Sequence, residues 1–188
     1  MTKAFYARTS DFSGFDALPD FARKELSSVT NEGVSLGKRA AYGLLQRALD
    51  SLGFEGARIV RSIEKNAYGK PVCEEVEFSL SHTQGVVAVA ISSRPVGIDV
   101  ETLCGRKISD FSFALTTGEK VDGDEEFLSL WTKKEAIFKR RGNEKRFQPK
   151  NIFTASERTA TTVFTIDGKT FALSVATDEI EDLEILFI

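Results

Sequence analysis

The chain of 188 residues is 41% hydrophobic and 28% charged, a composition typical of a globular protein with one large domain or two small ones. Its formal net charge of −3 argues against general nucleic-acid binding, and its longest apolar run, Val86 to Ile91, is too short to span a bilayer. The start lacks the charged and apolar segments of a secretory signal. Two cysteines, Cys73 and Cys104, are too few for a disulfide framework and lack the spacing of a metal site. We therefore expect a cytoplasmic protein with free thiols and with no nucleic-acid or membrane partner.

The single histidine, His82, excludes zinc sites that are built from several histidines. A Ser-His-Asp hydrolase would have to use this residue alone. Chemistry in this chain is therefore expected to rest on carboxylates, lysines and a metal ion.

The first half of the chain predicts one long helix among short strands. Apolar residues at helical spacing and a stop at Gly53 predict a helix from Gly33 to Leu52, capped by Thr30 or Asn31. The other expected elements are a strand at 3–7, a short helix at 21–28, strands at 57–63, 76–81 and 86–92, and a polar turn at 81–85 that contains His82.

Two cations, Lys38 and Arg39, lie in the first half of the long helix. Positive charge is slightly unfavourable there because it opposes the helix dipole. The pair therefore either serves a ligand or belongs to a solvated face.

The second half predicts a similar order of elements. A strand at 97–101 is followed by a short helix at 111–115 and by a long helix at 122–141, whose acidic start and basic end suit the helix dipole. Three strands are expected at 152–156, 161–166 and 170–176, the last two joined by an Asp167-Gly168 hairpin turn. A strand, a long helix and three strands thus occur twice, so we expect two halves, residues 1–95 and 96–188.

The segment Gly97-Ile98-Asp99-Val100-Glu101 combines an apolar strand face with a pair of carboxylates. Side chains alternate along a strand, so Ile98 and Val100 share one face while Asp99 and Glu101 share the other. Two like charges this close raise each other's pKa unless a cation lies between them. Mg²⁺ commonly takes one or two carboxylates together with substrate phosphates. The segment is therefore either a solvated strand end or part of a magnesium site.

A further carboxylate, Glu135, interrupts the apolar stripe of the second long helix. It falls at intervals of three and four residues with Leu128, Trp131 and Phe138. A carboxylate on a buried stripe is costly unless it is paired or binds a metal. Either Lys139 pairs with Glu135 one turn away, or Glu135 joins the two strand carboxylates around Mg²⁺ and Lys139 meets the phosphates.

Four motifs occur in order along the chain: Gly69-Lys70-Pro71, Phe78-Ser79-Leu80-Ser81-His82-Thr83, the segment from Gly97 to Glu101, and Trp131-Thr132-Lys133-Lys134-Glu135-Ala136-Ile137-Phe138-Lys139. This ordered set resembles the 4′-phosphopantetheinyl transferase superfamily, most closely its single-chain, surfactin-synthetase-activating type. The resemblance implies transfer of the phosphopantetheine arm of coenzyme A to a serine of an apo acyl or peptidyl carrier protein, with release of adenosine 3′,5′-bisphosphate. It also implies an α+β fold of two similar halves related by a pseudo-twofold, each a helix packed on a small antiparallel sheet, with the active site between them.

The resemblance implies roles for individual residues as well. Asp99, Glu101 and Glu135 would hold Mg²⁺, or Mn²⁺ in its place. Lys139 would contact the phosphates, and Glu135 would be the base for the serine hydroxyl, with Glu119 or a metal-bound water as alternatives. The other residues implied to bind coenzyme A are Lys38, Arg39, Ser81 and His82 at the 3′-phosphate, and Gly69, Lys70 and Pro71 at the adenine end.

A basic run extends from Lys133 to Lys150, with eight basic residues and two acidic ones, Glu135 and Glu144. Carrier proteins in the reactions of this family are generally acidic. The run is therefore either the docking surface for the carrier, with Arg140 and Arg141 at its centre, or a solvated basic helix end.

Two other functions use the same residues. A Mg²⁺-dependent nucleotide pyrophosphatase would use the carboxylates with water as the nucleophile, and would turn over coenzyme A without a carrier protein. A non-catalytic module that binds coenzyme A or a synthase domain would tolerate loss of Glu135. In each case a monomer is expected, because a duplicated chain needs no partner to complete one site.

Overall fold

The computed structural model describes residues 1–102, 113–144 and 146–188. The elements of the first half are β1 (Thr2–Arg8), η1 (Thr9–Phe12), α1 (Asp20–Leu26), α2 (Glu32–Ser51), α3 (Gly56–Ser62), β2 (Glu64–Lys65), β3 (Pro71–Val72), β4 (Glu77–Thr83) and β5 (Val86–Ser92). Those of the second half are β6 (Gly97–Glu101), α4 (Asp124–Arg140), η3 (Pro149–Asn151), η4 (Thr154–Ser156), β7 (Thr159–Ile166), β8 (Lys169–Ala176), η5 (Ile180–Asp182) and β9 (Leu183–Phe187).

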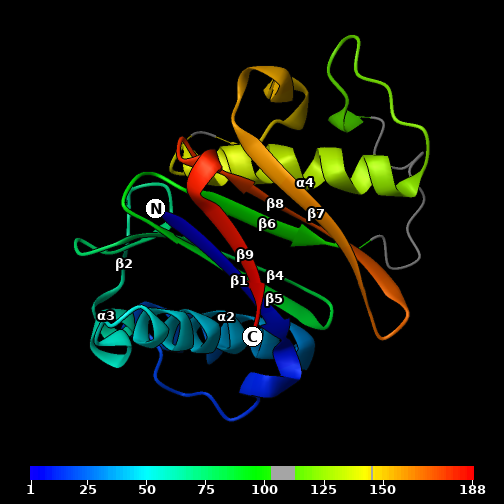
Figure 1. The fold of residues 1–188 in the computed structure, drawn as a ribbon. Helices are drawn as coiled ribbons and strands as arrows, with labels where there is room; N and C mark the ends of the chain where they lie inside the picture. Colours follow the sequence, from blue (N-terminus) through cyan, green and yellow to red (C-terminus); the bar gives the residue numbers. More distant parts are fainter. Residues whose placement is uncertain (103–112, 145) are drawn as a thin grey trace.

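Two sheets pack against each other between the two long helices (Figure 1). The first sheet has the strand order β4-β5-β1-β9 and the second the order β6-β8-β7, while β2 and β3 form a separate short ribbon. Helix α2 packs on the first sheet and α4 on the second, so the layers run helix, sheet, sheet, helix. The architecture is thus α+β, as expected.

The halves share both element order and strand order. Each has a strand, a long helix and then a hairpin, namely β1-α2-β4-β5 and β6-α4-β7-β8. In each sheet the second hairpin strand lies in the middle, giving the orders β4-β5-β1 and β7-β8-β6. The order strand, long helix, hairpin is therefore present in both halves; the ribbon β2-β3 in the first half and strand β9 in the second have no counterpart among the described residues of the other half.

The long helices form where sequence signals predict them. The side chain of Asn31 caps α2 by accepting a hydrogen bond from the Val34 N–H at 3.1 Å, and Gly53 ends the helix region with a φ of +84°. Helix α4 carries acidic residues in its first turn and basic ones in its last, in accordance with the helix dipole. The strands predicted at 86–92 and 97–101 have the predicted bounds.

The inner faces of the two sheets are complementary in size. The first sheet contributes small side chains, including Ala4, Ala88 and Ala90, and the second contributes large ones, including Phe171 and Leu173. All five are at most 1% exposed. Small residues opposite large ones let the sheets approach closely and fill the space between them.

Two predicted strands are wrong. Residues 57–63 form α3 and its C-terminal cap, in which Ile59, Val60 and Ile63 are buried at a spacing that fits a helix. The carboxylate of Asp50 accepts a hydrogen bond from the Gly56 N–H at 2.9 Å and so helps to start this helix. Residues 152–156 lie around the two short turns η3 and η4 instead of forming a strand.

Other differences lie at strand ends. Strand β4 continues to Thr83, so His82 lies in a strand and the connecting turn contains only Gln84 and Gly85. Strand β9 was not predicted, because five acidic residues between 178 and 184 mask its pattern; it lies parallel to β1 in the first sheet. The proposed boundary at residues 95 and 96 falls between the two sheets, but β9 returns from the second half to the first sheet.

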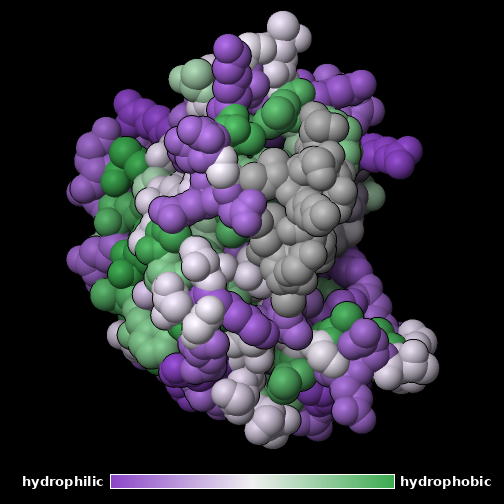
Figure 2. Space-filling view, turned by 90° about the vertical axis from the view of Figure 1, so that its right-hand side faces the viewer, coloured by the Kyte–Doolittle hydropathy of each residue, from purple (hydrophilic) through white to green (hydrophobic). Residues whose placement is uncertain are grey.

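Cys104 and the first two residues of the short helix expected at 111–115 lie outside the described residues, and residues 113 and 114 lie in a 3-10 turn. Cys73 is a free thiol. Among the helices that the structure describes, none combines the length and apolar character needed to cross a membrane. On the face drawn in Figure 2, hydrophilic and hydrophobic side chains are interspersed.

Helix α4 lies directly on the backbone of β6 at Gly97. A Cβ at this position would be 1.9 Å from the carbonyl oxygen of Ala136 and 2.6 Å from the backbone nitrogen of Arg140. Both contacts involve helix backbone, which cannot move aside as a flexible side chain could. Glycine at 97 is therefore what allows α4 to approach the strand that carries Asp99 and Glu101.

We predict that Gly97→Ala destabilises the protein by about 3 kcal/mol, at the upper end of overpacking costs. Unfolding in urea, followed by circular dichroism, measures the change. Gly14→Ala is the matched control, because a Cβ there meets nothing within 4 Å. An unfolding midpoint of Gly97→Ala equal to that of the control would contradict the close packing of α4 on β6.

Candidate active site

The predicted carboxylates, Ser81 and Lys139 meet where the edge strands of the two sheets, β4 and β6, lie side by side. We call this contact the seam. Backbone N–H groups on the outer edge of β6 donate to serine hydroxyls of β4: Ile98 N to Ser79 Oγ at 3.1 Å and Val100 N to Ser81 Oγ at 3.2 Å. Side-chain hydroxyls thus satisfy an edge that would otherwise expose unpaired backbone donors.

Asp99 is the most buried carboxylate of the seam, with 4% of its surface exposed. Its Oδ1 accepts hydrogen bonds from Ser81 Oγ and Lys139 Nζ, both at 2.7 Å. Its Oδ2 is buried and has no hydrogen-bond partner among the residues that the structure describes. A buried carboxylate oxygen without a donor is unusual, because its desolvation is not compensated.

Lys139 lies across the seam on α4. Besides Asp99, its ammonium group contacts the carbonyl oxygen of Ile98 at 3.2 Å. The lysine therefore forms its ion pair with Asp99 and not with Glu135, the helical neighbour that the sequence offered as an alternative.

Glu101 and Glu135 lie near each other and near Asp99, so their charges interact. Glu101 accepts hydrogen bonds from Thr83 Oγ1 at 2.9 Å and from the Thr102 N–H at 3.3 Å. Burial, reinforced by the charges of Asp99 and Glu101 and opposed by Lys139, raises the pKa of Glu135 to about 7. The three predicted carboxylates are therefore close enough to repel one another.

Among the described residues, no three histidine, cysteine, aspartate or glutamate side chains are gathered into a ready-made metal site. The chemistry of the donor set nevertheless suits a hard divalent cation, which binds carboxylate oxygens. Such an ion would satisfy the unpartnered Oδ2 of Asp99 and relieve the repulsion that raises the pKa of Glu135.

His82 lies on the α2 side of β4, against Gly37. A Cβ at position 37 would be 2.6 Å from Nδ1 of the ring, so glycine makes room for the histidine. Burial, together with the charges of Lys139 and Lys38, lowers the pKa of His82 to about 4. The ring is therefore neutral at pH 7, and two lysines lie close enough to it to influence its pKa.

The two cations of α2 point to different places. Lys38 lies close enough to His82 to affect its pKa, and its Nζ donates to Glu25 at 3.2 Å. Arg39 instead bonds to Asp16 at 2.9 Å and to the carbonyl oxygen of Phe15 at 3.3 Å. Lys38 is thus the cation that the fold brings toward the site.

The turn at residues 66–70 is held by the side chain of Asn66. Its Oδ1 accepts hydrogen bonds from the backbone of Tyr68 and Lys70, both at 2.9 Å, while its Nδ2 donates to the carbonyl oxygen of Gly142 at 3.0 Å. The predicted adenine-end turn, with Gly69 at a φ of +82° and Pro71 just after it, therefore lies against the end of α4.

Lys70, at the end of this turn, is only 6% exposed. Its Nζ donates to the carbonyl oxygen of Val96 at 3.4 Å, and burial lowers its pKa. Its stem thus packs between the turn and β6.

Glu119 forms a buried ion pair with Lys134. The ammonium group of Lys134, 0% exposed, is 2.6 Å from Glu119 and donates to the carbonyl oxygens of Ala114 and Pro149. Burial alone would raise the pKa of Glu119, but hydrogen bonds from Lys134 and Thr116 outweigh it and lower the pKa. A paired carboxylate of lowered pKa is a poor base, so the geometry favours Glu135 over Glu119.

Much of the basic run from 133 to 150 is used inside the protein. Arg140 bonds to Glu157 at 2.8 Å and to Asp178 at 2.6 Å, and Arg141 bonds to Glu157 at 2.5 Å. Lys134 and Lys139 are paired as described above, and Lys145 lies outside the described residues. Arg140 and Arg141, the centre of the predicted docking surface, are thus engaged in ion pairs, although Arg141 is still exposed. Arg146 and Lys150 are exposed as well.

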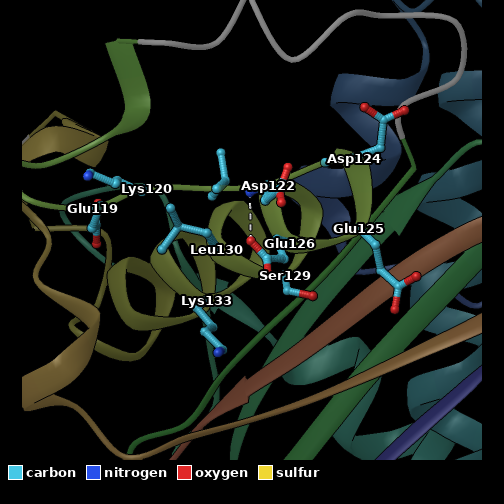
Figure 3. A pocket seen from close by; sticks show the side chains of 11 residues that line it. Glu119, Lys120, Asp122, Asp124, Glu125, Glu126, Ser129, Leu130 and Lys133 are labelled. Atoms are coloured by element: carbon cyan, nitrogen blue, oxygen red, sulfur yellow. Dashed lines mark hydrogen bonds between the residues drawn. The ribbon is translucent and has the colours of Figure 1, made fainter.

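A separate hollow of about 630 Å³ lies beside the first turns of α4 (Figure 3). Its walls are residues 119–126 with Ser129, Leu130 and Lys133. Five of these residues are acidic and two are lysines, which makes the hollow unsuitable for a phosphate group. Asp99, Glu101 and Glu135 do not line it.

Sequence reasoning missed the supporting residues Ser79, Thr83, Gly37 and Asn66. The signal for two of them was present, since Ser79, Ser81 and Thr83 alternate on one face of the predicted strand. Nothing in the sequence shows that this face meets the edge of β6. The contacts of Gly37 and Asn66 likewise require the assembled fold.

His82 should make folding pH-dependent, with a definite sign. Its folded pKa of about 4 lies below the unfolded value of 6.5, so below pH 6.5 the unfolded chain binds a proton that the folded chain excludes. We predict that the wild type loses about 2 kcal/mol of stability from this group between pH 7.5 and pH 5. Urea unfolding across this range measures the loss, and His82→Gln should lack that part of the slope. Parallel pH profiles for the two proteins would show that His82 titrates normally.

No protein-family model matches the chain. A curated relative, the 4′-phosphopantetheinyl transferase gsp of Aneurinibacillus migulanus, is 30% identical over 109 residues. The match covers 53% of this chain and 46% of the relative, so the chain spans about half of the protein that it matches. The resemblance to the 4′-phosphopantetheinyl transferase superfamily that the four motifs predicted is confirmed by this relative.

Proposed function

We propose that this protein transfers the 4′-phosphopantetheine arm of coenzyme A to a serine of an apo acyl or peptidyl carrier protein. The site lies between two halves of like topology, which we propose to be a pseudo-twofold 4′-phosphopantetheinyl transferase fold. The observation that carries the proposal is the buried Oδ2 of Asp99 at the seam, which has no partner in the described part of the chain and lies near two further carboxylates and the Lys139 ammonium group. The relative supports the same reaction class.

Asp99, Glu101 and Glu135 would hold the divalent cation, Mg²⁺ or Mn²⁺. When bound, the ion would neutralise the negative charge of the pyrophosphate of coenzyme A. Breaking a pyrophosphate depends on charge neutralisation and in-line positioning more than on covalent catalysis, which suits a site that has carboxylates and lysines but no evident nucleophile.

The chain's own residues would bind and orient the substrates. Lys38 and His82 would hold the 3′-phosphate, with His82 neutral and therefore able to donate one hydrogen bond. Lys139 would contact the phosphates. The carboxylate of Glu135 would take the proton of the carrier serine as its oxygen forms a bond to phosphorus and the pyrophosphate bond breaks, releasing adenosine 3′,5′-bisphosphate.

We predict that purified protein, coenzyme A, Mg²⁺ and a panel of apo carrier proteins yield a carrier with one added phosphopantetheine, seen by intact mass. Glu135→Ala should lower the rate at least 100-fold, the scale of lost acid–base catalysis alone. Glu125→Ala is the matched control, an exposed carboxylate on the same helix. EDTA should abolish transfer.

Two outcomes would contradict the proposal. Hydrolysis of coenzyme A without any carrier, lost in Glu135→Ala, would indicate a pyrophosphatase. Tight binding of coenzyme A without turnover on any carrier would indicate a binding module.

For carrier docking we predict that Arg146→Glu combined with Lys150→Glu raises KM for the carrier about fivefold, equivalent to roughly 1 kcal/mol of lost charge attraction. Affinity for coenzyme A should not change. Arg140→Glu is the comparison: it breaks ion pairs with Glu157 and Asp178 and should lower the melting temperature. An unchanged KM in the double variant would place the docking surface elsewhere.

A further inference from the structure

Strand β4 presents three hydroxyl side chains at alternate positions toward the edge of β6: Ser79, Ser81 and Thr83. The first two accept hydrogen bonds from backbone N–H groups of β6, at 3.1 and 3.2 Å. The last two donate to carboxylates, Ser81 to Asp99 at 2.7 Å and Thr83 to Glu101 at 2.9 Å. Hydroxyls two residues apart on one strand thus meet carboxylates two residues apart on the other.

The direction of the Ser81 hydrogen bonds is fixed by chemistry. A backbone N–H can only donate and a carboxylate can only accept, so the serine oxygen accepts from Val100 and its single proton goes to Asp99. Ser81 is 7% exposed. Its proton is therefore already used inside the protein, which leaves none for the 3′-phosphate of coenzyme A that the family resemblance assigned to this residue.

The same hydrogen bond makes the two oxygens of Asp99 unequal. Oδ1 accepts hydrogen bonds from Ser81 and Lys139, whereas the buried Oδ2 has no partner in residues 1–102, 113–144 and 146–188. Donors that hold one oxygen of a carboxylate fix the orientation of the other, as outer hydrogen bonds do around metal ligands. Thr83 holds one oxygen of Glu101 in a similar way.

We propose that Ser81 and Thr83 are positioning residues, which hold Asp99 and Glu101 in the orientation that receives the divalent cation. The inference rests on the metal site of the proposed function. The donors come from the first sheet and the carboxylates from the second, so the affinity for the ion depends on how the two sheets are aligned at the seam.

The test is titration of the purified full chain with MnCl₂, with free Mn²⁺ read by electron paramagnetic resonance. Titrations are run without and with coenzyme A, and coenzyme A without protein is the blank. Thermal unfolding in EDTA reports stability separately. Binding of coenzyme A is measured by calorimetry, which separates a metal role from a phosphate-binding role.

Four variants separate the contacts. Thr83→Val replaces the hydroxyl with a methyl group of similar size. It should weaken Mn²⁺ binding about tenfold, the lower end of the loss in metal affinity when a hydrogen bond to a metal ligand is removed. Thr83→Ser keeps the hydroxyl and should bind as the wild type does. Ser81→Ala should weaken Mn²⁺ binding at least as much as Thr83→Val. Ser79→Ala is the matched control, because it removes a seam hydrogen bond to the backbone that touches no carboxylate; it should lower the melting temperature but leave Mn²⁺ affinity unchanged.

Three results would overturn the inference. Equal loss of Mn²⁺ affinity in Ser79→Ala and Ser81→Ala would assign the effect to general loosening of the seam. Weaker coenzyme A binding in Ser81→Ala with unchanged Mn²⁺ affinity would return Ser81 to the phosphate site. If the wild type binds no Mn²⁺ in either titration, the metal site itself is rejected, together with the metal-dependent part of the proposed function. If the wild type binds Mn²⁺ and the variants bind it equally well, only the positioning role is rejected.

Discussion

The backbone contact between α4 and β6 at Gly97 is the constraint on which the rest of the site depends. The helix approaches the strand so closely that even a methyl group has no room, and this places Glu135 and Lys139 beside Asp99. Were α4 a further methyl diameter away, the lysine could not reach the carboxylate at hydrogen-bond distance. The electrostatic coupling that raises the pKa of Glu135 would fall with the same separation.

Elements with a single strong signal could be predicted from the sequence, and ambiguous ones could not. Helix α2 has a cap, a stop and an apolar face, and strands β5 and β6 have clear patterns; all three form where predicted. The apolar run 57–63 has no clear cap or stop signal, and it forms a helix that packs against α2. In strand β9, Leu183 and Ile185 alternate with residues that face outward, but the acidic residues before the strand obscure this alternation in the sequence. That the segment is a strand becomes evident only from its pairing with the edge of β1.

The candidate site divides in the same way. The carboxylates at 99, 101 and 135 could be selected because their residue type conflicts with their apolar surroundings, and that conflict is visible in sequence. The partners of those groups could not, because they depend on long-range contacts. Lys139 forms an ion pair with Asp99 instead of its helical neighbour Glu135, and Lys134 forms one with Glu119. Ser81 donates a hydrogen bond across the seam to Asp99. The candidate site residues could thus be selected from the sequence, whereas their hydrogen-bond partners could be identified only in the fold.

Strand β9 has a consequence for the order in which the molecule can be completed. It pairs in parallel with β1, with Thr2 opposite Leu183. The outer edge of β1 therefore stays uncovered until β9 has been synthesised. During synthesis, Tyr6 and its aromatic neighbours Phe164 and Phe187 cannot assemble until the second sheet and this final strand have emerged. Contacts of such long sequence separation form slowly, because most of the chain must be ordered before they are gained. The first sheet is therefore complete only after part of the second half has joined it.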